Sequence, residues 1–227
     1  MKLEGKKIAF LGDSITEGYG VSDRPNNRYD NRLKKLCSLE KVFNYGIGGT
    51  RLAHQSRPSE NPRHDLCFCG RAYNISKEAD IIVVYGGVND FLHGDAPIGE
   101  YGDKTPATFC GGVYYLMNFL KKTYEGKPIV FIAPAKCQRK DFSHTEKSTH
   151  PNKKPDAMPL LGYVEIIQQT AKEFDIPVLS FYHSLGLDPK DPEIFAKYTV
   201  DGLHFNDAGH EFLANCLRDF LEALPEA

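Results

Sequence analysis

The chain has 227 residues, of which 41% are hydrophobic, and this length suits a single domain with a substantial core. Its formal net charge of −2 gives no reason to expect nucleic acid or an anionic membrane as a partner. No stretch approaches the roughly 18 apolar residues of a membrane span, and the N-terminal apolar run is too short for a signal peptide. We therefore expect one cytoplasmic domain over residues 1–227, without stable membrane association, that acts on small molecules or neutral polymers.

The six cysteines are scattered along the chain rather than clustered in a compact disulfide framework, which favours reduced thiols. Cys67 and Cys69 lie close to His64, a combination that can indicate a metal site. Their spacing is not that of a CxxC pair, however, and no second pair completes a tetrahedral ligand set. We expect neither a metal nor a cofactor.

The first predicted element is a strand over residues 7–11, which the sequence Gly12-Asp13-Ser14 ends in a turn. In α/β proteins, ligands bind beyond the carboxyl ends of such strands, so Ser14 occupies a position suited to chemistry. A serine after a strand also serves commonly as a helix cap. Ser14 alone therefore does not decide the function.

A helix is predicted over residues 26–37, and a second strand over 41–45 runs into the glycine-rich turn 46–50. Residues 51–77 contain prolines and are expected to be irregular, with short helices. The buried face of the predicted helix has spacings of four and three residues: Tyr29, Leu33 and Leu36.

Residues 81–85 form a continuous apolar run, typical of a strand buried on both faces of a parallel sheet. This strand also ends in glycines, followed by Val88-Asn89-Asp90. The next helix is expected to start at Thr105-Pro106, since threonine caps helices and proline suits the first helical position. Its buried stripe consists of Phe109, Val113, Leu116 and Leu120.

A fourth strand is predicted over 128–133, a fifth over 177–181 and a last helix from about residue 206. Between the fourth strand and the next helix lies the polar, lysine-rich segment 134–155, whose length is typical of a lid or binding loop. A solvated surface and an anion-binding role both remain open for it. The apolar stripes of the last two helices are Leu161, Val164, Ile167, Ala171 and Phe174, and Leu213, Leu217, Phe220 and Leu224.

Strands alternate with helices over the whole length, which predicts an α/β fold with a parallel sheet covered on both faces. Right-handed crossovers restrict the strand order, and we expect five strands in the order 2-1-3-4-5.

The turns after the first three strands meet at one edge of such a sheet, and Asp201 and His204 precede the last helix. Together these residues supply what ester hydrolysis requires. Ser14 would be the nucleophile, His204 its base and Asp201 the group that steadies the imidazole. The backbone N–H groups of Ser14 and Gly49 and the Asn89 side-chain amide would form the oxyanion hole.

These residues make the chain resemble the SGNH hydrolases, the GDSL-like lipase/esterase family, from about Lys7 to Leu224. The resemblance implies a flavodoxin-like three-layer fold and metal-free hydrolysis of esters or thioesters through an acyl-enzyme. Isoleucine replaces the leucine of GDSL at Ile15, and the serine lacks the GxSxG context of ordinary α/β-hydrolases. The residues that carry the resemblance are Ser14 in GDSI, Gly49 in NYGIGGT, Asn89 in GGVND and His204 in DGLH.

Other polar residues lie near these positions in the sequence. Asp13 and Asp90 flank proposed catalytic residues, and we expect them to organise the site by accepting backbone hydrogen bonds. Asp90, His93 and Arg51 are also candidates for the lining of a substrate pocket.

The substrate is less specified than the reaction, because the fold does not choose among esters. The polar character of segment 134–155 differs from the apolar lid of a membrane-active lipase, which favours a short acyl group, such as acetyl, on a carbohydrate or other polar carrier. Lysophospholipid or thioester hydrolysis stays open. A non-catalytic flavodoxin-like module that binds phosphate or flavin is a further alternative, but it leaves Asp201 and His204 unexplained. The sequence does not indicate an oligomeric state.

Overall fold

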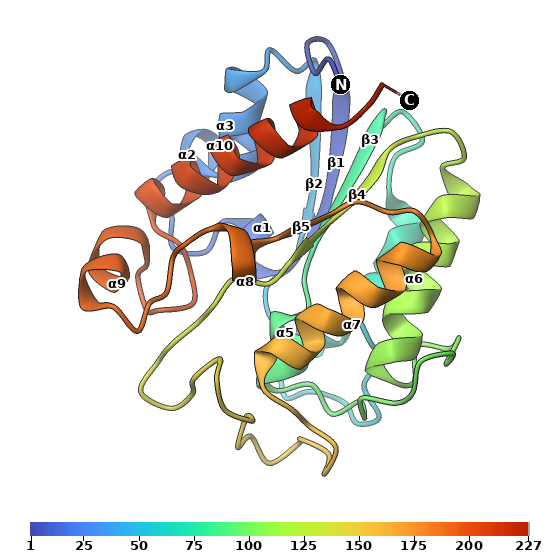
Figure 1. Ribbon diagram of the computed structural model, residues 1–227, viewed down its shortest axis with the longest axis vertical. Coiled ribbons are helices and arrows are strands. Elements are labelled where there is room, and N and C mark those ends of the chain that lie inside the picture. The colour runs from blue at the N-terminus through green and yellow to red at the C-terminus, as the bar shows by residue number, and fades with distance from the viewer. Residues whose placement is uncertain (227) are drawn as a thin grey trace.

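The computed structural model describes residues 1–226, and a parallel sheet runs through its middle (Figure 1). Its strands are β1 (Lys7–Gly12), β2 (Lys41–Gly46), β3 (Ile81–Tyr85), β4 (Ile129–Ala133) and β5 (Val178–Ser180). They lie in the order β2-β1-β3-β4-β5, which confirms the predicted α/β fold and strand order. The winding direction reverses between β1 and β3, so a crevice at their carboxyl ends is the expected binding place.

One face of the sheet is covered by α3 (Tyr29–Leu36) and α10 (Asp207–Ala223), which lie side by side (Figure 1). Leu33, Leu217 and Phe10 are fully buried in the core cluster between these helices and the sheet. The short helix α8 (Phe181–Ser184) follows β5 directly.

The opposite face is covered by α6 (Phe109–Thr123) and α7 (Leu160–Glu173) (Figure 1). The core on this side includes Val84, Val113 and Ile167. The predicted stripe of α6 is buried throughout. Segment 51–77 contains the short helices that we expected: η1 (Pro62–Asp65), α4 (Phe68–Arg71) and η2 (Ala72–Asn74).

Three short helices lie at or near the carboxyl ends of the strands: α1 (Ser14–Glu17) after β1, α5 (Val88–Leu92) after β3, and α9 (Pro192–Tyr198) before α10. Because β1 and β3 are neighbours, α1 and α5 begin from the same edge of the sheet. None of the helices within residues 1–226 has the length and apolar character to cross a membrane.

The helix predicted over 26–37 is in fact two, α2 (Arg24–Asn27) and α3, separated at Arg28, whose backbone is extended. The break has a tertiary cause: the Tyr29 backbone N–H donates to Nδ1 of His210 in α10 at 3.1 Å instead of to a helical carbonyl. Leu36, expected in the buried stripe, is 47% exposed.

The predicted start of the helix at Thr105-Pro106 was also wrong, because Thr108 is the residue that caps α6. Its hydroxyl accepts a hydrogen bond from the Gly111 backbone N–H at 3.0 Å. Residues 105–108 pack over the first turn instead, where a Cβ on Gly111 would collide with the Thr105 carbonyl oxygen.

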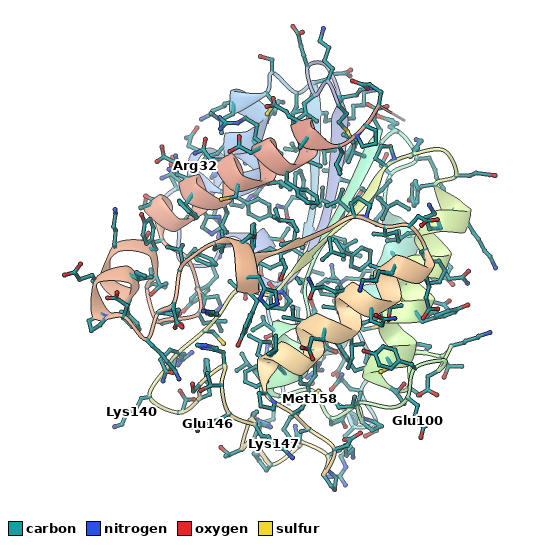
Figure 2. All side chains as sticks on the ribbon, viewed as in Figure 1. Arg32, Glu100, Lys140, Glu146, Lys147 and Met158 are labelled. Atoms are coloured by element: carbon teal, nitrogen blue, oxygen red, sulfur yellow. The ribbon has the colours of Figure 1, made fainter. Side chains whose placement is uncertain are left out.

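The connection between β4 and α7 extends over residues 134–159, longer than the segment predicted from its polarity, and we call it the long loop. Figure 2 shows Lys140, Glu146 and Lys147 along this loop, at the edge of the molecule. The long loop has little regular structure of its own beyond an isolated bridge between Gln138 and Ser143.

Candidate active site

Ser14 is the first residue of α1, and its side chain is half-buried at the carboxyl end of β1. The Asp13 carboxylate caps the helix by accepting a hydrogen bond from the Ile15 backbone N–H at 3.0 Å. A Cβ on Gly12 would collide with a side chain of α1, and one on Gly46 with the backbone of α1. Gly-Asp-Ser therefore folds into a tight strand-to-helix turn that presents the serine hydroxyl at the sheet edge.

The Ser14 hydroxyl lies 2.9 Å from Nε2 of His204, and Nδ1 of His204 lies 3.0 Å from Oδ2 of Asp201. We call these three side chains the triad. The other Asp201 oxygen accepts hydrogen bonds from the backbone N–H groups of Leu203 and His204, at 3.1 and 2.8 Å. The turn that carries both residues thus orients the carboxylate toward the ring. In such a series, an imidazole can take the hydroxyl proton while the carboxylate holds the ring in place.

Burial alone would raise the pKa of Asp201, but hydrogen bonds from the side chain and backbone of His204 lower it to about 2. The carboxylate is therefore ionised at neutral pH and favours a proton on Nδ1, which leaves the Nε2 lone pair facing Ser14. The Tyr19 ring lies over the imidazole, with 4.3 Å between ring centroids, and is 51% exposed.

The long loop packs on the turn that carries Asp201 and His204. Gln138 donates its backbone N–H to the Gly202 carbonyl oxygen at 2.9 Å, and Arg139 Nη1 lies 3.4 Å from Asp201 Oδ2. Gly202 has a φ of +78°, and a Cβ there would collide with the Gln138 carbonyl oxygen. Only glycine allows this close approach without strain.

On the other side of Ser14, the Asn89 side chain of α5 connects two strand ends. Its Nδ2 lies 3.1 Å from the Thr50 carbonyl oxygen and 3.4 Å from Oδ2 of Asp13. Gly49 precedes Thr50 with a φ of +75°, and a Cβ on it would collide with the His64 ring. The Asn89 amide therefore bridges Asp13, which precedes Ser14, and Thr50, which follows Gly49.

The turn after β2 is held close to Ser14 by Glu17, one helical turn after the serine. Oε2 of Glu17 accepts the Gly48 backbone N–H at 2.7 Å, and Oε1 pairs with Arg63 at 2.6 Å. A Cβ on Gly48 would lie 3.5 Å from Cβ of Ser14. Gly48, the residue before Gly49, thus lies beside Ser14. Sequence reasoning missed Glu17, because an acid in the first turn of a helix is ordinary.

Arg71 of α4 also joins the ends of β1 and β2. Its Nη2 donates to the Gly12 carbonyl oxygen at 3.0 Å and to Oγ1 of Thr50 at 2.9 Å, and its Nη1 contacts the Tyr45 carbonyl oxygen. The guanidinium is largely buried, so these bonds compensate its lost hydration. No pattern in the irregular segment singles out this arginine.

Asp13 and Asp90 are both buried, and burial raises the pKa of each to about 6. The Asp90 carboxylate accepts the backbone N–H groups of Leu52 and Ala53, at 2.9 and 3.1 Å. Arg51 is 2% exposed and bonds to protein groups. These contacts favour support of the site over substrate contact for Asp90 and Arg51. His93 contacts Arg51 through Nδ1, at 3.1 Å, and Asn89 through Nε2, at 3.2 Å.

Lys153 anchors the long loop beneath α5. Its Nζ donates to the Asp90 carbonyl oxygen at 2.6 Å and to the Tyr163 hydroxyl at 2.8 Å. Burial lowers the pKa of this lysine to about 8. At least one cation of the loop is therefore a structural contact rather than part of a solvated surface.

The cysteines are free thiols, and Cys67 and Cys69 are buried in α4 and the residue before it. Over residues 1–226 no group of three or more histidine, cysteine or acidic side chains has the arrangement of a metal site. Cys67 Sγ instead accepts the Gly70 backbone N–H at 3.4 Å.

Comparison with protein families gives a match over residues 10–212 to the model of the GDSL-like Lipase/Acylhydrolase family. A search of curated proteins gives no match.

Several solved structures are similar over nearly their whole length. A protein from Lactobacillus plantarum is 30% identical, with a TM-score of 0.82, and the match covers 98% of this chain and 99% of that one. A lipase/acylhydrolase from Enterococcus faecalis is 19% identical, with a TM-score of 0.64 and 98% and 99% coverage. An acetyl xylan esterase, AlAXEase, is 18% identical, with a TM-score of 0.60 and 95% and 99% coverage. The last two likenesses concern the fold.

Proposed function

The chain belongs to the GDSL-like lipase/acylhydrolase family and is a hydrolase, and we propose that it cleaves carboxylic esters through an acyl-enzyme on Ser14. The observation that carries this proposal is the hydrogen-bonded series from the Ser14 hydroxyl through His204 to Asp201, with distances of 2.9 and 3.0 Å. A phosphate- or flavin-binding module of the same fold has no need of such a series.

In the first half-reaction, Ser14 Oγ attacks the ester carbonyl carbon while His204 Nε2 takes the hydroxyl proton. The imidazolium that forms is stabilised by the Asp201 carboxylate. The proton then passes to the leaving oxygen, the bond between acyl carbon and alcohol breaks, and the alcohol departs. The acyl group stays as an ester of Ser14.

Water completes the reaction. His204, neutral again, takes a proton from a water molecule that attacks the acyl carbon. Collapse of this second tetrahedral intermediate breaks the bond to Ser14 Oγ, which recovers its proton from the imidazolium. The carboxylic acid leaves and the enzyme is restored.

In both intermediates the negative oxygen is proposed to bind the backbone N–H groups of Ser14 and Gly49 and the amide Nδ2 of Asn89. Donors fixed before the reaction cost no reorganisation when the charge develops. The close packing of these turns by Glu17 and Arg71 supports this role.

Ser14→Ala tests the nucleophile. It should abolish hydrolysis of p-nitrophenyl acetate and labelling by a fluorophosphonate probe. Ser76→Ala is a matched control, since Ser76 lies before β3, at the opposite end of the strand from α5, and should leave both readouts unchanged. Activity and labelling retained by Ser14→Ala would refute the proposal.

As substrate we propose a short acyl group, such as acetyl, on a carbohydrate or another polar carrier. Polar groups surround the triad, among them Arg139 of the long loop and the Glu17–Arg63 pair, and the His64 ring crowds Gly49. Such surroundings suit a small acyl chain and a hydroxyl-rich leaving group better than a long alkyl chain.

A series of p-nitrophenyl esters from acetate to octanoate, followed by acetylated xylo-oligosaccharides, would test this choice. We expect kcat/KM to fall as the acyl chain lengthens. Preference for octanoate, for lysophosphatidylcholine or for an acyl thioester would favour the lysophospholipase or thioesterase alternative. The cytoplasmic location remains part of the proposal and is supported by the free thiols.

A further inference from the structure

A chain of polar side chains leads from buried Arg51 through half-buried His93 to the buried Asn89 amide. Arg51 Nη1 lies 3.1 Å from His93 Nδ1, and His93 Nε2 lies 3.2 Å from Asn89 Oδ1. Arg51 is itself held by Asp65 Oδ1 and the His64 carbonyl oxygen, both at 3.0 Å. None of these contacts reaches the triad directly.

The direction of each hydrogen bond follows from what the groups can donate. A guanidinium has donors only, so His93 Nδ1 must accept with its lone pair. The ring is then neutral, with its proton on Nε2, and this N–H donates to Asn89 Oδ1. Burial, together with the nearby Arg51 charge, lowers the pKa of His93 to about 3, in agreement with a neutral ring.

This arrangement also decides which way the Asn89 amide faces. With Oδ1 bound to His93, the NH₂ group points to the Thr50 carbonyl oxygen and to Asp13, which precedes Ser14. The reverse orientation would set two donors against each other at His93 and bring Oδ1 against the oxygens of Thr50 and Asp13. One amide hydrogen is used by Thr50 at 3.1 Å, whereas the contact to Asp13 is long, 3.4 Å, and leaves the other available.

We propose that Arg51 and His93 are positioning residues that lock the Asn89 amide with its N–H toward the oxyanion. The proposal rests on the oxyanion role of Asn89 in the proposed function. Arg51 fixes the tautomer of His93, and His93 fixes the orientation of the amide. Arg51 and His93 thereby contribute to catalysis without touching the substrate.

A double-mutant cycle of His93→Leu and Asn89→Ala tests this coupling. Loss of an oxyanion donor costs on the order of 100-fold or more in turnover, and a misoriented donor should cost about 10-fold. We expect His93→Leu to lower kcat by about 10-fold, with KM changed less than about twofold because the amide acts on the transition state. In the Asn89→Ala background, the same change should cost less than about twofold.

Fully additive losses in the cycle would overturn the proposal, because His93 would then act by another route. If Asn89→Ala leaves kcat unchanged while Ser14→Ala abolishes it, the oxyanion role and this inference both fail, but the serine mechanism stands. Activity retained by Ser14→Ala instead refutes the proposed function itself.

His93→Gln guards against a folding artefact, since its amide can donate to Asn89 Oδ1 from about the place of Nε2. We expect it to recover most of the kcat lost in His93→Leu. Its activity between about pH 5 and 8 should have the same profile as the wild type, because His93 does not titrate there. A displaced profile, or no recovery at unchanged thermal stability, would contradict the proposal. The control is His54→Leu, an exposed histidine outside this chain of contacts, which should leave kcat unchanged.

Discussion

The two sides of Ser14 are built differently. On the oxyanion side, Asn89 and its partners Thr50 and Asp13 are almost wholly buried, and only His93 behind them is half-buried. On the base side, the His204 and Asp201 side chains are 14% and 27% exposed, and Tyr19, whose ring lies over His204, is 51% exposed. In the proposed mechanism, the charge that develops on the substrate would meet fixed donors, whereas the group that carries protons would stay accessible to water and the leaving alcohol. The difference indicates that rigidity is concentrated where charge must be stabilised.

The largest effect should come from the base side. Asp201→Asn is nearly isosteric but removes the charge that favours a proton on His204 Nδ1. We expect kcat to fall by on the order of 10⁴-fold, with the fold intact, as judged by circular dichroism. Because the pKa of Asp201 is about 2, the carboxylate stays ionised down to low pH. Any loss of wild-type activity on acidification between about pH 8 and 5 should therefore come from other groups, such as Asp13 and Asp90, whose pKa values burial raises to about 6. A drop smaller than about tenfold in the variant would contradict the role of Asp201.

The oxyanion side should give the next effect. Asn89→Ala removes one donor, and we expect kcat to fall by about 10²- to 10³-fold, with KM little changed. Steady-state kinetics on p-nitrophenyl acetate give both constants. An increase in KM at constant kcat would mean that the amide binds the ground state instead.

A smaller effect is expected at Arg139, which approaches the triad from the long loop. Its guanidinium lies 3.4 Å from Asp201 Oδ2, so Arg139→Gln removes one charged contact that holds the carboxylate. In steady-state kinetics on p-nitrophenyl acetate, kcat should fall by only about two- to threefold, because the arginine is 40% exposed and its charge is screened. Arg139→Lys keeps the charge and serves as the control. A fall of tenfold or more would contradict this minor role.

The smallest effect concerns stability rather than turnover. Burial lowers the pKa of His210 from 6.5 to about 3. Between these two pH values the histidine is protonated in the unfolded state and neutral in the folded state. Its contribution to stability is present above about pH 6.5 and is lost as pH falls toward 3, by about 1 kcal/mol at pH 5.5. His210→Asn keeps an acceptor for the Tyr29 N–H but removes the titration. Urea unfolding at about pH 7 and 5.5 should show a smaller loss of stability on acidification in the variant; an equal loss would contradict this assignment.

The sequence was sufficient for the parts that depend on local pattern. Alternating strands and amphipathic helices predicted the sheet and its order, and the DGLH motif before the last helix pointed to the histidine that lies beside Ser14. The sequence was insufficient where tertiary contacts determine the bounds of a helix. His210 divides a predicted helix by taking the Tyr29 N–H, and Thr108 displaces Thr105 as a cap once residues 105–108 pack on α6.

The dependence on tertiary contacts also explains why several supporting residues could not be predicted. Arg71, Glu17 and Arg139 act through contacts with residues far from them in sequence or with backbone atoms that carry no sequence signal. The sequence singles out Arg51 and His93 only as candidates for a pocket lining. Their contacts with each other and with Asn89 depend on the turn after β2 lying beside α5, which only the folded chain reveals.

The glycine at position 202 has a consequence for engineering. Because the Gln138 carbonyl occupies the place where a side chain would begin, the long loop and the turn that carries Asp201 and His204 fit each other as one unit. A loop grafted from another esterase to change substrate preference would have to bring a compatible turn with it. The exchangeable module therefore consists of two segments, residues 134–159 and 199–206, and should be transplanted whole.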